Sequence, residues 1–321
     1  MSVSIGIDIG GTKIAGGLVD AEGRLVEQAR RDTPAQDAEA IITGTVDLIR
    51  ELAEKARAHG DEAPKVGVAC AGYIDREGAT VLFAPNIAWR HEPLRAQLQE
   101  ATGHDVVIEN DANAAGYGEF RYGGGKNVDD MVMITLGTGV GGGIVLGGEV
   151  FRGSHGVGAE IGHMRVVPHG HLCGCGNRGC FEMYASGSAL VRDARALVDE
   201  GTPQGKRLRE LCDGKLENLR GVHVTQAAQE GDEAAVALLA EIGRWLGEGA
   251  ASLTAILDPQ LFVIGGGLAE AGDLVLEPAR VAFAEELTGG GHRPAARFCV
   301  ATLGNDAGVV GAAALAREGR A

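Results

Sequence analysis

A strand, a glycine-rich turn and a second strand occur twice along this chain of 321 residues. The first copy runs from Ile5 to Val19 and turns at Gly10-Gly11-Thr12-Lys13. The second runs from Met131 to Leu146 and turns at Gly137-Thr138-Gly139-Val140-Gly141-Gly142. Such recurrence predicts a duplicated fold whose halves present their turns to one nucleotide. An ordinary glycine hairpin is the alternative for either turn alone. Because neighbouring glycines let backbone N–H groups approach an anion closely, the repetition favours phosphate binding.

Residues beside the glycine turns add to the expected phosphate site. Thr12 and Lys13 supply further donors, and Asp8 stands at the end of the first strand, where a divalent cation is held through water. Later in the chain, Leu261 to Ile264 is a predicted strand that leads into Gly265-Gly266-Gly267. This triplet lets the backbone approach a flat ligand such as adenine, with a tight strand-to-helix turn as the alternative.

The second turn also matches G-x-G-x-x-G, the pattern of dinucleotide-binding proteins. In those proteins the glycines open a helix, whereas Gly143-Ile144-Val145-Leu146 favours a strand. The chain contains no G-x-x-x-x-G-K-[ST] motif either. We therefore expect neither a dinucleotide-binding fold nor a P-loop.

The remaining pattern predicts a layered α/β fold. Three antiparallel strands end near Arg31 and are followed by alternating helices and parallel strands. The helices are expected at 37–59, 93–102, 114–122, 188–199, 225–230 and 232–257, and further strands at 65–71, 80–83, 106–109 and 298–302. An alanine-rich helix after Gly304 is expected to pack back on the first domain.

Three of the six cysteines, Cys173, Cys175 and Cys180, have C-x-C-x4-C spacing, and His163 lies shortly upstream. Three thiolates and one imidazole suit tetrahedral zinc and leave no position open for water, so we expect a structural rather than a catalytic metal. Disulfides or buried free thiols are the alternative, although Cys173 and Cys175 are too close for an easy bridge. The other cysteines are scattered, which favours a reducing compartment.

Carboxylates occur at two places where a small polar ligand would bind. Glu160 and Glu182 bracket the cysteine cluster, and a metal would hold them together. Glu109-Asn110-Asp111-Ala112-Asn113 follows a predicted strand, at the edge of an α/β sheet where ligands usually bind. Asp111 is a candidate site residue there, and a helix N-cap is its alternative role.

The composition limits the class of protein. A chain of 321 residues exceeds what one hydrophobic core usually supports, which predicts two domains. The net charge of -15 argues against nucleic acid or an anionic membrane as a partner. The N-terminus lacks the basic and apolar regions of a signal peptide, and no stretch reaches membrane-spanning length. We expect a soluble cytoplasmic protein.

Gly162-His163 followed by C-x-C-G-x-x-G-C-x-E resembles the signature of the ROK family of sugar kinases and repressors. With both phosphate turns and the Gly265 triplet, the resemblance covers nearly the whole chain. It implies an actin-like ribonuclease H duplication with two lobes around a nucleotide and sugar cleft. Residues 1–118 with a C-terminal helix at about 305–321 would form a small α/β lobe, and residues 119–304 a large α/β lobe with the zinc loop and a helical segment. The family also leads us to expect a homodimer or homotetramer.

The resemblance assigns roles to individual residues. Asp111, in an E-N-D-A-N motif, is implied to be the general base, so its N-cap alternative loses support. The residues implied to bind the sugar are Gly72, Asn86, Asn110, Asp111, Glu160, His163 and Glu182. Those implied to bind ATP with Mg²⁺ are Asp8, Gly10, Gly11, Thr12, Lys13, Gly137, Thr138, Gly139, Gly141, Gly265, Gly266 and Gly267. Those implied to bind the structural zinc are His163, Cys173, Cys175 and Cys180.

Within the family, the chain is most similar to the ATP-dependent glucokinases of the actinobacterial type, through residues 79–94 and 161–168. One departure is Ala88, where a polar residue is expected. The resemblance implies transfer of the ATP γ-phosphoryl group to the 6-hydroxyl of glucose. A kinase for N-acetylglucosamine, mannose or fructose and a polyphosphate-using glucokinase are alternatives. A transcriptional regulator is less expected, because a helix-turn-helix domain would have to precede the first phosphate turn, which begins at Asp8.

Overall fold

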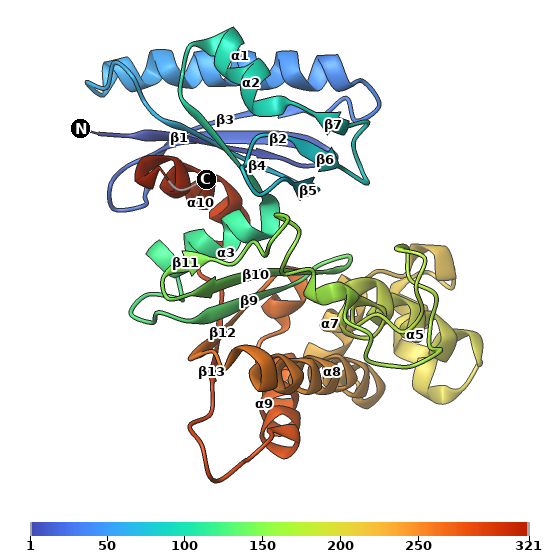
Figure 1. The fold of residues 1–321 in the computed structure, drawn as a ribbon. Coiled ribbons are helices and arrows are strands. Elements are labelled where there is room, and N and C mark those ends of the chain that lie inside the picture. Colours follow the sequence, from blue (N-terminus) through green and yellow to red (C-terminus); the bar gives the residue numbers. More distant parts are fainter. Residues whose placement is uncertain (1, 320–321) are drawn as a thin grey trace. The chain divides into compact units, whose positions relative to one another are not determined.

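Two five-stranded sheets repeat the same arrangement in residues 2–319, the part of the chain that the computed structural model describes (Figure 1). The first sheet has the strand order β3-β2-β1-β4-β8 and the second β11-β10-β9-β12-β13. In both, the two strands joined by a glycine turn, β1 with β2 and β9 with β10, are neighbours. The predicted duplication is confirmed.

The first sheet brings the ends of three parallel strands to one edge. It consists of β1 (Ser4–Ile9), β2 (Lys13–Val19), β3 (Leu25–Asp32), β4 (Val66–Cys70) and β8 (Val106–Asn110). Strands β1 to β3 are antiparallel, whereas β4 is parallel to both β1 and β8. Asp8 pairs with Ala69, which pairs with Glu109, and Cys70 pairs with Asn110. The polar residues at the strand ends therefore lie near one another, where α/β sheets usually bind ligands.

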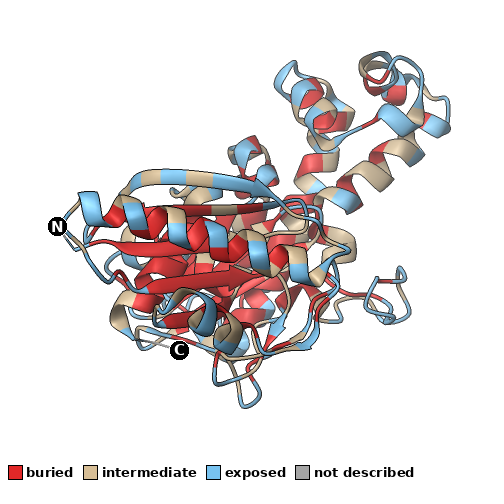
Figure 2. Cartoon of the chain, turned by 90° about the horizontal axis from the view of Figure 1, so that it is seen from above, coloured by how far each residue is buried: buried red, intermediate tan, exposed pale blue. Residues whose placement is uncertain are grey.

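Helix α1 (Ala38–Ala58) covers one face of this sheet. Asp37 caps its N-terminus by accepting a hydrogen bond from the Ala40 N–H (3.0 Å), and the chain leaves the helix at Gly60 with φ +84°. Apolar residues at helical spacing form a buried side against β1 to β3, while the opposite side is exposed (Figure 2). The helix predicted at 37–59 is confirmed.

Helix α10 (Ala307–Glu318) covers the other face and also packs against α3 (Asp111–Tyr122) (Figure 1). Its approach to β1 and β4 requires Gly6 and Gly67. A Cβ at Gly6 would lie 1.9 Å from the Val309 carbonyl oxygen, and one at Gly67 would lie 1.8 Å from the Ala312 carbonyl oxygen. The prediction that the C-terminal helix packs back on the first domain is confirmed.

The second sheet consists of β9 (Met131–Leu136), β10 (Val140–Leu146), β11 (Glu149–Val150), β12 (Leu261–Gly265) and β13 (Arg297–Val300). Between β11 and β13 the chain forms α4 (Glu182–Ala185), α5 (Gly187–Asp199), α6 (Lys206–Leu211), α7 (Gly221–Gln229), α8 (Glu233–Leu257) and α9 (Asp273–Glu286). Because the second glycine turn leads into strand β10 rather than a helix, the rejection of a dinucleotide-binding fold is confirmed.

Smaller elements connect these layers. The strands β5 (Tyr73–Ile74), β6 (Val81–Phe83) and β7 (Arg90–Glu92) form an antiparallel sheet, which α2 (Leu94–Thr102) follows. Short 3-10 helices lie at Ile161–His163, Pro203–Gly205, Leu216–Asn218, Gly267–Ala271 and Gly304–Asp306.

Three helices were not predicted from the sequence, α4, α6 and α9. Helix α9 contains Pro278, and proline usually ends or kinks a helix because it lacks an N–H and clashes with the preceding turn. Helix α7 also begins earlier than predicted, at Gly221 rather than near Thr225.

The chain divides into two compact units. Unit 1 consists of Met1–Val132, Gly143–Ala159 and Thr302–Ala321, and unit 2 of Met133–Gly142 and Glu160–Ala301. The predicted small and large lobes around a cleft stay a prediction. None of the helices in residues 2–319 combines the length and the apolar character needed to cross a membrane.

Candidate functional site

Two carboxylates of unit 1 stand where β1, β4 and β8 end. Asp8 lies near the end of β1, and Asp111 opens α3 directly after β8. Burial raises the pKa of Asp8 to about 6, an effect that the Asp111 carboxylate increases and Lys13 opposes. Burial also raises the pKa of Asp111. Carboxylates with raised pKa values at a sheet edge are candidates for proton transfer and cation binding.

Asn110, and not Asp111, is the N-cap of α3. Its Oδ1 accepts hydrogen bonds from the N–H groups of Ala112 (2.9 Å) and Asn113 (3.0 Å). Its Nδ2 donates to the Gly72 carbonyl oxygen (3.0 Å). The N-cap alternative for Asp111 is therefore wrong, since capping does not use its side chain. Gly72 and Asn110, two residues implied to bind sugar, are thus hydrogen-bonded to each other, and Asn110 directly precedes Asp111.

Glu109 accepts hydrogen bonds from the first turn of α3 and forms an ion pair with Arg152. Glu109 is 3% exposed, and its Oε1 accepts hydrogen bonds from Asn110 N–H (2.9 Å) and Asn113 Nδ2 (3.1 Å). Its Oε2 accepts from Arg152 Nε (2.7 Å). Sequence analysis named Glu109 only as part of a motif and missed Arg152, which is distant in sequence and belongs to no recognisable pattern.

The first glycine turn lies beside another predicted sugar residue. Gly10 N–H donates to the Lys13 carbonyl oxygen (3.0 Å), which closes the turn, and Thr33 Oγ1 donates to the Gly10 carbonyl oxygen (2.8 Å). A Cβ at Gly11 would lie only 3.3 Å from the Asn86 Cβ. Unit 1 thus brings the predicted phosphate turn and Asn86 together.

Unit 2 contains a cavity of about 850 Å³, a volume typical of small-molecule sites. Gly137 and Thr138 of the second glycine turn and Gly267 of the glycine triplet line it. The predicted contacts Gly139, Gly141, Gly265 and Gly266 are not among its lining residues. Much of the remaining wall comes from α5 and α7, including Arg192, Arg195 and Gln226. These residues were not predicted as site residues, because their spacing indicates only a helix and not a ligand site.

Helix α5 begins at the second glycine turn. Gly187 N–H donates to the Gly137 carbonyl oxygen (2.8 Å), and Ser188 N–H donates to the Thr138 carbonyl oxygen (3.3 Å). A Cβ at Gly187 would lie 2.8 Å from the Gly137 carbonyl oxygen, so this approach favours glycine. The positive end of the helix dipole therefore adjoins the cavity wall, where it would stabilise an anion.

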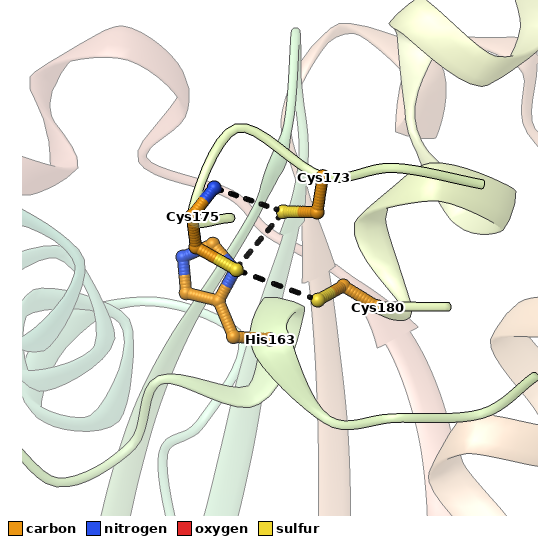
Figure 3. A group of neighbouring side chains, drawn as sticks. All are labelled: His163, Cys173, Cys175 and Cys180. Atoms are coloured by element: carbon orange, nitrogen blue, oxygen red, sulfur yellow. Dashed lines mark hydrogen bonds between the residues drawn. The ribbon is translucent and has the colours of Figure 1, made fainter. Parts of the chain in front are cut away.

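The four predicted zinc ligands, His163, Cys173, Cys175 and Cys180, form one cluster in unit 2 (Figure 3). Their ligand atoms all lie within 4.8 Å of one another. Cys175 Sγ is 3.6 Å from Cys180 Sγ, and Cys173 Sγ is 3.6 Å from His163 Nδ1. A tetrahedral zinc ion with bonds of about 2.0–2.3 Å holds its ligand atoms roughly 3.5–3.8 Å apart, so the donor set fits zinc. All six cysteines are free thiols, which removes the disulfide alternative.

Glu160 and Glu182 lie beside this cluster. Glu182 Oε1 accepts a hydrogen bond from Cys173 Sγ (2.9 Å) and lies 3.8 Å from His163 Nδ1. Glu160 Oε2 lies 4.0 Å from His163 Nε2. Because Nδ1 faces the thiols and Nε2 faces Glu160, this imidazole suits a metal on one side and a polar ligand on the other.

The sugar residues that the resemblance implies fall into two groups. Gly72, Asn86, Asn110 and Asp111 belong to unit 1, and Glu160, His163 and Glu182 belong to unit 2.

Comparison with known proteins identifies the family. A model of the ROK family matches residues 4–319. A glucokinase of Streptomyces coelicolor is 49% identical over 99% of this chain and 98% of its own length. A glucokinase of Thermotoga maritima is 37% identical over 98% of this chain and 97% of its own length.

A solved structure agrees with these sequences. The crystal structure of a ROK family glucokinase from Streptomyces griseus in complex with glucose and AMPPNP superposes with a TM-score of 0.84 at 49% identity. The similarity covers 99% of this chain and 100% of that chain. The chain belongs to the ROK family, and the predicted actin-like fold is confirmed.

We expect the purified protein to contain about one zinc ion per chain, because three thiolates and an imidazole complete a structural site. Substitution Cys175→Ala should release the metal and lower the midpoint of thermal unfolding, since binding free energy contributes to folding. Elemental analysis and a melting curve measure both effects. The control is Cys212→Ala, a buried free thiol outside the cluster, which should keep its zinc. A wild-type protein that lacks zinc after zinc-supplemented expression would contradict the assignment.

Asp8 should make stability fall as pH rises. Its pKa is raised from 3.8 to about 6 on folding, so between these values the folded state binds more protons than the unfolded state. Asp8→Asn removes this dependence. Its stability relative to wild type should therefore increase by about 2 kcal/mol from pH 4 to pH 6 and become constant near pH 8. Urea unfolding without added nucleotide or Mg²⁺ measures it.

The control for this prediction is Asp20→Asn. Asp20 is also buried, but hydrogen bonds and charge from Arg24 outweigh burial and lower its pKa. That carboxylate stabilises the fold above its unfolded pKa of 3.8, so the stability of its variant relative to wild type should fall only as pH rises to about 4 and should then stay level. A level profile for Asp8→Asn between pH 4 and pH 8 would show that Asp8 has an ordinary pKa.

Proposed function

We propose that this protein is a glucokinase that transfers the γ-phosphoryl group of ATP to the 6-hydroxyl of glucose. The observation that carries the proposal is the full-length similarity, at 49% identity, to Streptomyces glucokinases, one of them solved with glucose and AMPPNP. The arrangement of Asp111 at the end of β8, beside Gly72 and Asn110, supports it. The chemistry below follows from these residues.

Asp111 acts as the general base. It accepts the proton of the sugar 6-hydroxyl as the oxygen attacks the γ-phosphorus in line. Burial raises its pKa, and a base is most effective when its pKa approaches the working pH. Asp8 would hold Mg²⁺ through its water shell, and Mg²⁺ would neutralise charge on the phosphates.

The cavity of unit 2 binds the nucleotide. Gly267 and the residues of α5 and α7 receive the adenosine, and Gly137 and Thr138 with the N-terminus of α5 receive the phosphates. In unit 1, Gly10, Gly11, Thr12 and Lys13 form the second phosphate contact. A cavity large enough for a nucleoside favours ATP over polyphosphate as the donor.

The zinc loop orients the sugar acceptors. His163, Cys173, Cys175 and Cys180 would hold the metal, which supplies a rigid cross-link and no chemical step. Glu160 and Glu182 accept hydrogen bonds from sugar hydroxyls, and a metal-bound Cys173 thiolate leaves Glu182 Oε1 without its present donor. Such acceptors reject analogues that lack the hydroxyl, because the carboxylate would stay unpaired.

Other expectations are part of the same proposal. A kinase for another hexose would share most of these residues, so it is the alternative function. Ala88 departs from the polar residue expected in segment 79–94, which is the segment that resembles glucokinases. A cytoplasmic location and a homodimer or homotetramer follow from the composition and from the family resemblance.

Glucose should give the highest kcat/KM among hexoses. ADP release with Mg-ATP would be measured in parallel for glucose, N-acetylglucosamine, mannose and fructose, with polyphosphate as a second donor. Dominance of another hexose would leave the kinase assignment intact and change its substrate. No turnover with any sugar would refute the assignment.

Asp111→Ala should lower kcat by about 10²- to 10⁴-fold, the usual contribution of a positioned base. ATP binding should change little, because the cavity lies in unit 2. Steady-state kinetics measures kcat, and nucleotide titration measures the affinity for ATP. The control is Asp37→Ala, which removes another aspartate at a helix N-terminus of unit 1. If both variants kept near-normal kcat, Asp111 would have only a structural role.

A further inference from the structure

An ion pair outside the predicted site holds the turn that carries Asp111. Both oxygens of Glu109 are engaged, Oε1 by Asn110 N–H and Asn113 Nδ2 and Oε2 by Arg152 Nε. Asn110 and Asn113 stand on either side of Asp111 in the first turn of α3. Glu109 therefore fixes the backbone before Asp111 and a side chain after it, and its hydrogen bonds go to Asn110, Asn113 and Arg152 rather than to the Asp111 carboxylate.

We propose that the ion pair of Arg152 and Glu109 is a positioning device for the general base Asp111. The proposal rests on the proposed kinase function, in which the base must come within hydrogen-bond distance of the sugar hydroxyl. Without Arg152, Glu109 would be a buried carboxylate without a counter-charge. Such a group takes up a proton or moves towards water. Either change weakens its hold on Asn110 and Asn113, and so displaces the first turn of α3.

Arg152 is suited to this role because its own loop is anchored to unit 1. Its carbonyl oxygen accepts a hydrogen bond from Gly158 N–H (2.9 Å). Gly156 packs so closely on β5 that a Cβ there would lie 2.3 Å from the Ile74 carbonyl oxygen. The Arg152 side chain is only 17% exposed.

A second ion pair of unit 1 provides the comparison for a purely structural role. Asp20 is 0% exposed, and its Oδ2 accepts from Arg24 Nε at 2.8 Å, close to the 2.7 Å between Glu109 and Arg152. Asp20 follows Val19, which pairs with Ser4 at the start of β1, far along the strand from Asp8. Removing the Asp20–Arg24 pair therefore deletes a buried carboxylate with a similar ion-pair distance at a place far from Asp111. It shows what loss of such a pair does to stability alone.

The test compares the double variants Glu109→Leu/Arg152→Met and Asp20→Asn/Arg24→Met with wild type. Removing both charges together avoids a lone buried charge that would unfold the protein. Leucine also lacks the acceptor that Glu109 Oε1 offers to Asn110 and Asn113. We expect Glu109→Leu/Arg152→Met to lower kcat about 10²-fold, the effect of misplacing a catalytic group by about 1 Å, with KM for ATP unchanged. Arg152→Lys keeps the opposite charge and should retain more activity than Arg152→Met. Asp20→Asn/Arg24→Met should alter the melting temperature but not kcat.

Amide hydrogen exchange supplies a readout that does not depend on the substrate. The first turn of α3 should lose protection in Glu109→Leu/Arg152→Met, whereas α1 should not. A kcat within about twofold of wild type, or an equal loss of kcat in Asp20→Asn/Arg24→Met, would overturn the proposal. If wild type phosphorylates no sugar, the proposed function fails. Unchanged protection of α3 would then refute the positioning role separately.

Discussion

The close packing of α10 on β1 and β4 determines the environment of the candidate site in unit 1. The helix reaches the sheet only because Gly6 and Gly67 have no Cβ, and it brings Gly308 to Asp8, where a Cβ would lie 2.9 Å from Oδ2. Asp8 is thereby partly shielded from water, and this shielding raises its pKa. Unit 1 tolerates an unfavourable buried acid beside Asp111 at the strand ends, as expected of a site where function costs stability.

In unit 2 the predicted sugar-binding carboxylates are positioned by a metal-ligand cluster rather than by close packing of a helix on a sheet. The loop that carries Glu160 and Glu182 has little regular structure, and its shape depends on the cluster of His163 with three thiols. Zinc would replace the hydrophobic contacts that such a loop cannot make. Helix α5 begins immediately after this loop and is bonded to the second glycine turn. Glu160, Glu182 and the part of the cavity wall that α5 forms thus belong to one continuous segment.

Much of this arrangement was predictable from local pattern. The two glycine turns, the capped α1 and the four zinc ligands each follow from residues close together in sequence, whose chemistry admits few alternatives. The choice of Asn110 as the N-cap of α3 was not predictable, because Asn110 and Asp111 are both good N-caps and only the backbone direction decides between them. Helix α9 was missed because Pro278 contradicts its local propensity.

The repeated strand-turn-strand unit, the metal-binding loop and the family membership could all be recognised in the sequence, since they depend on spacing and on residue chemistry. Which distant side chains support them became clear from the packing of the folded chain. Arg152 reaches Glu109 across 43 positions of sequence, and α5 and α7 line the cavity with residues whose spacing marks only a helix. Such contacts depend on how elements pack, and packing leaves no local signature because many sequences satisfy the same buried volume.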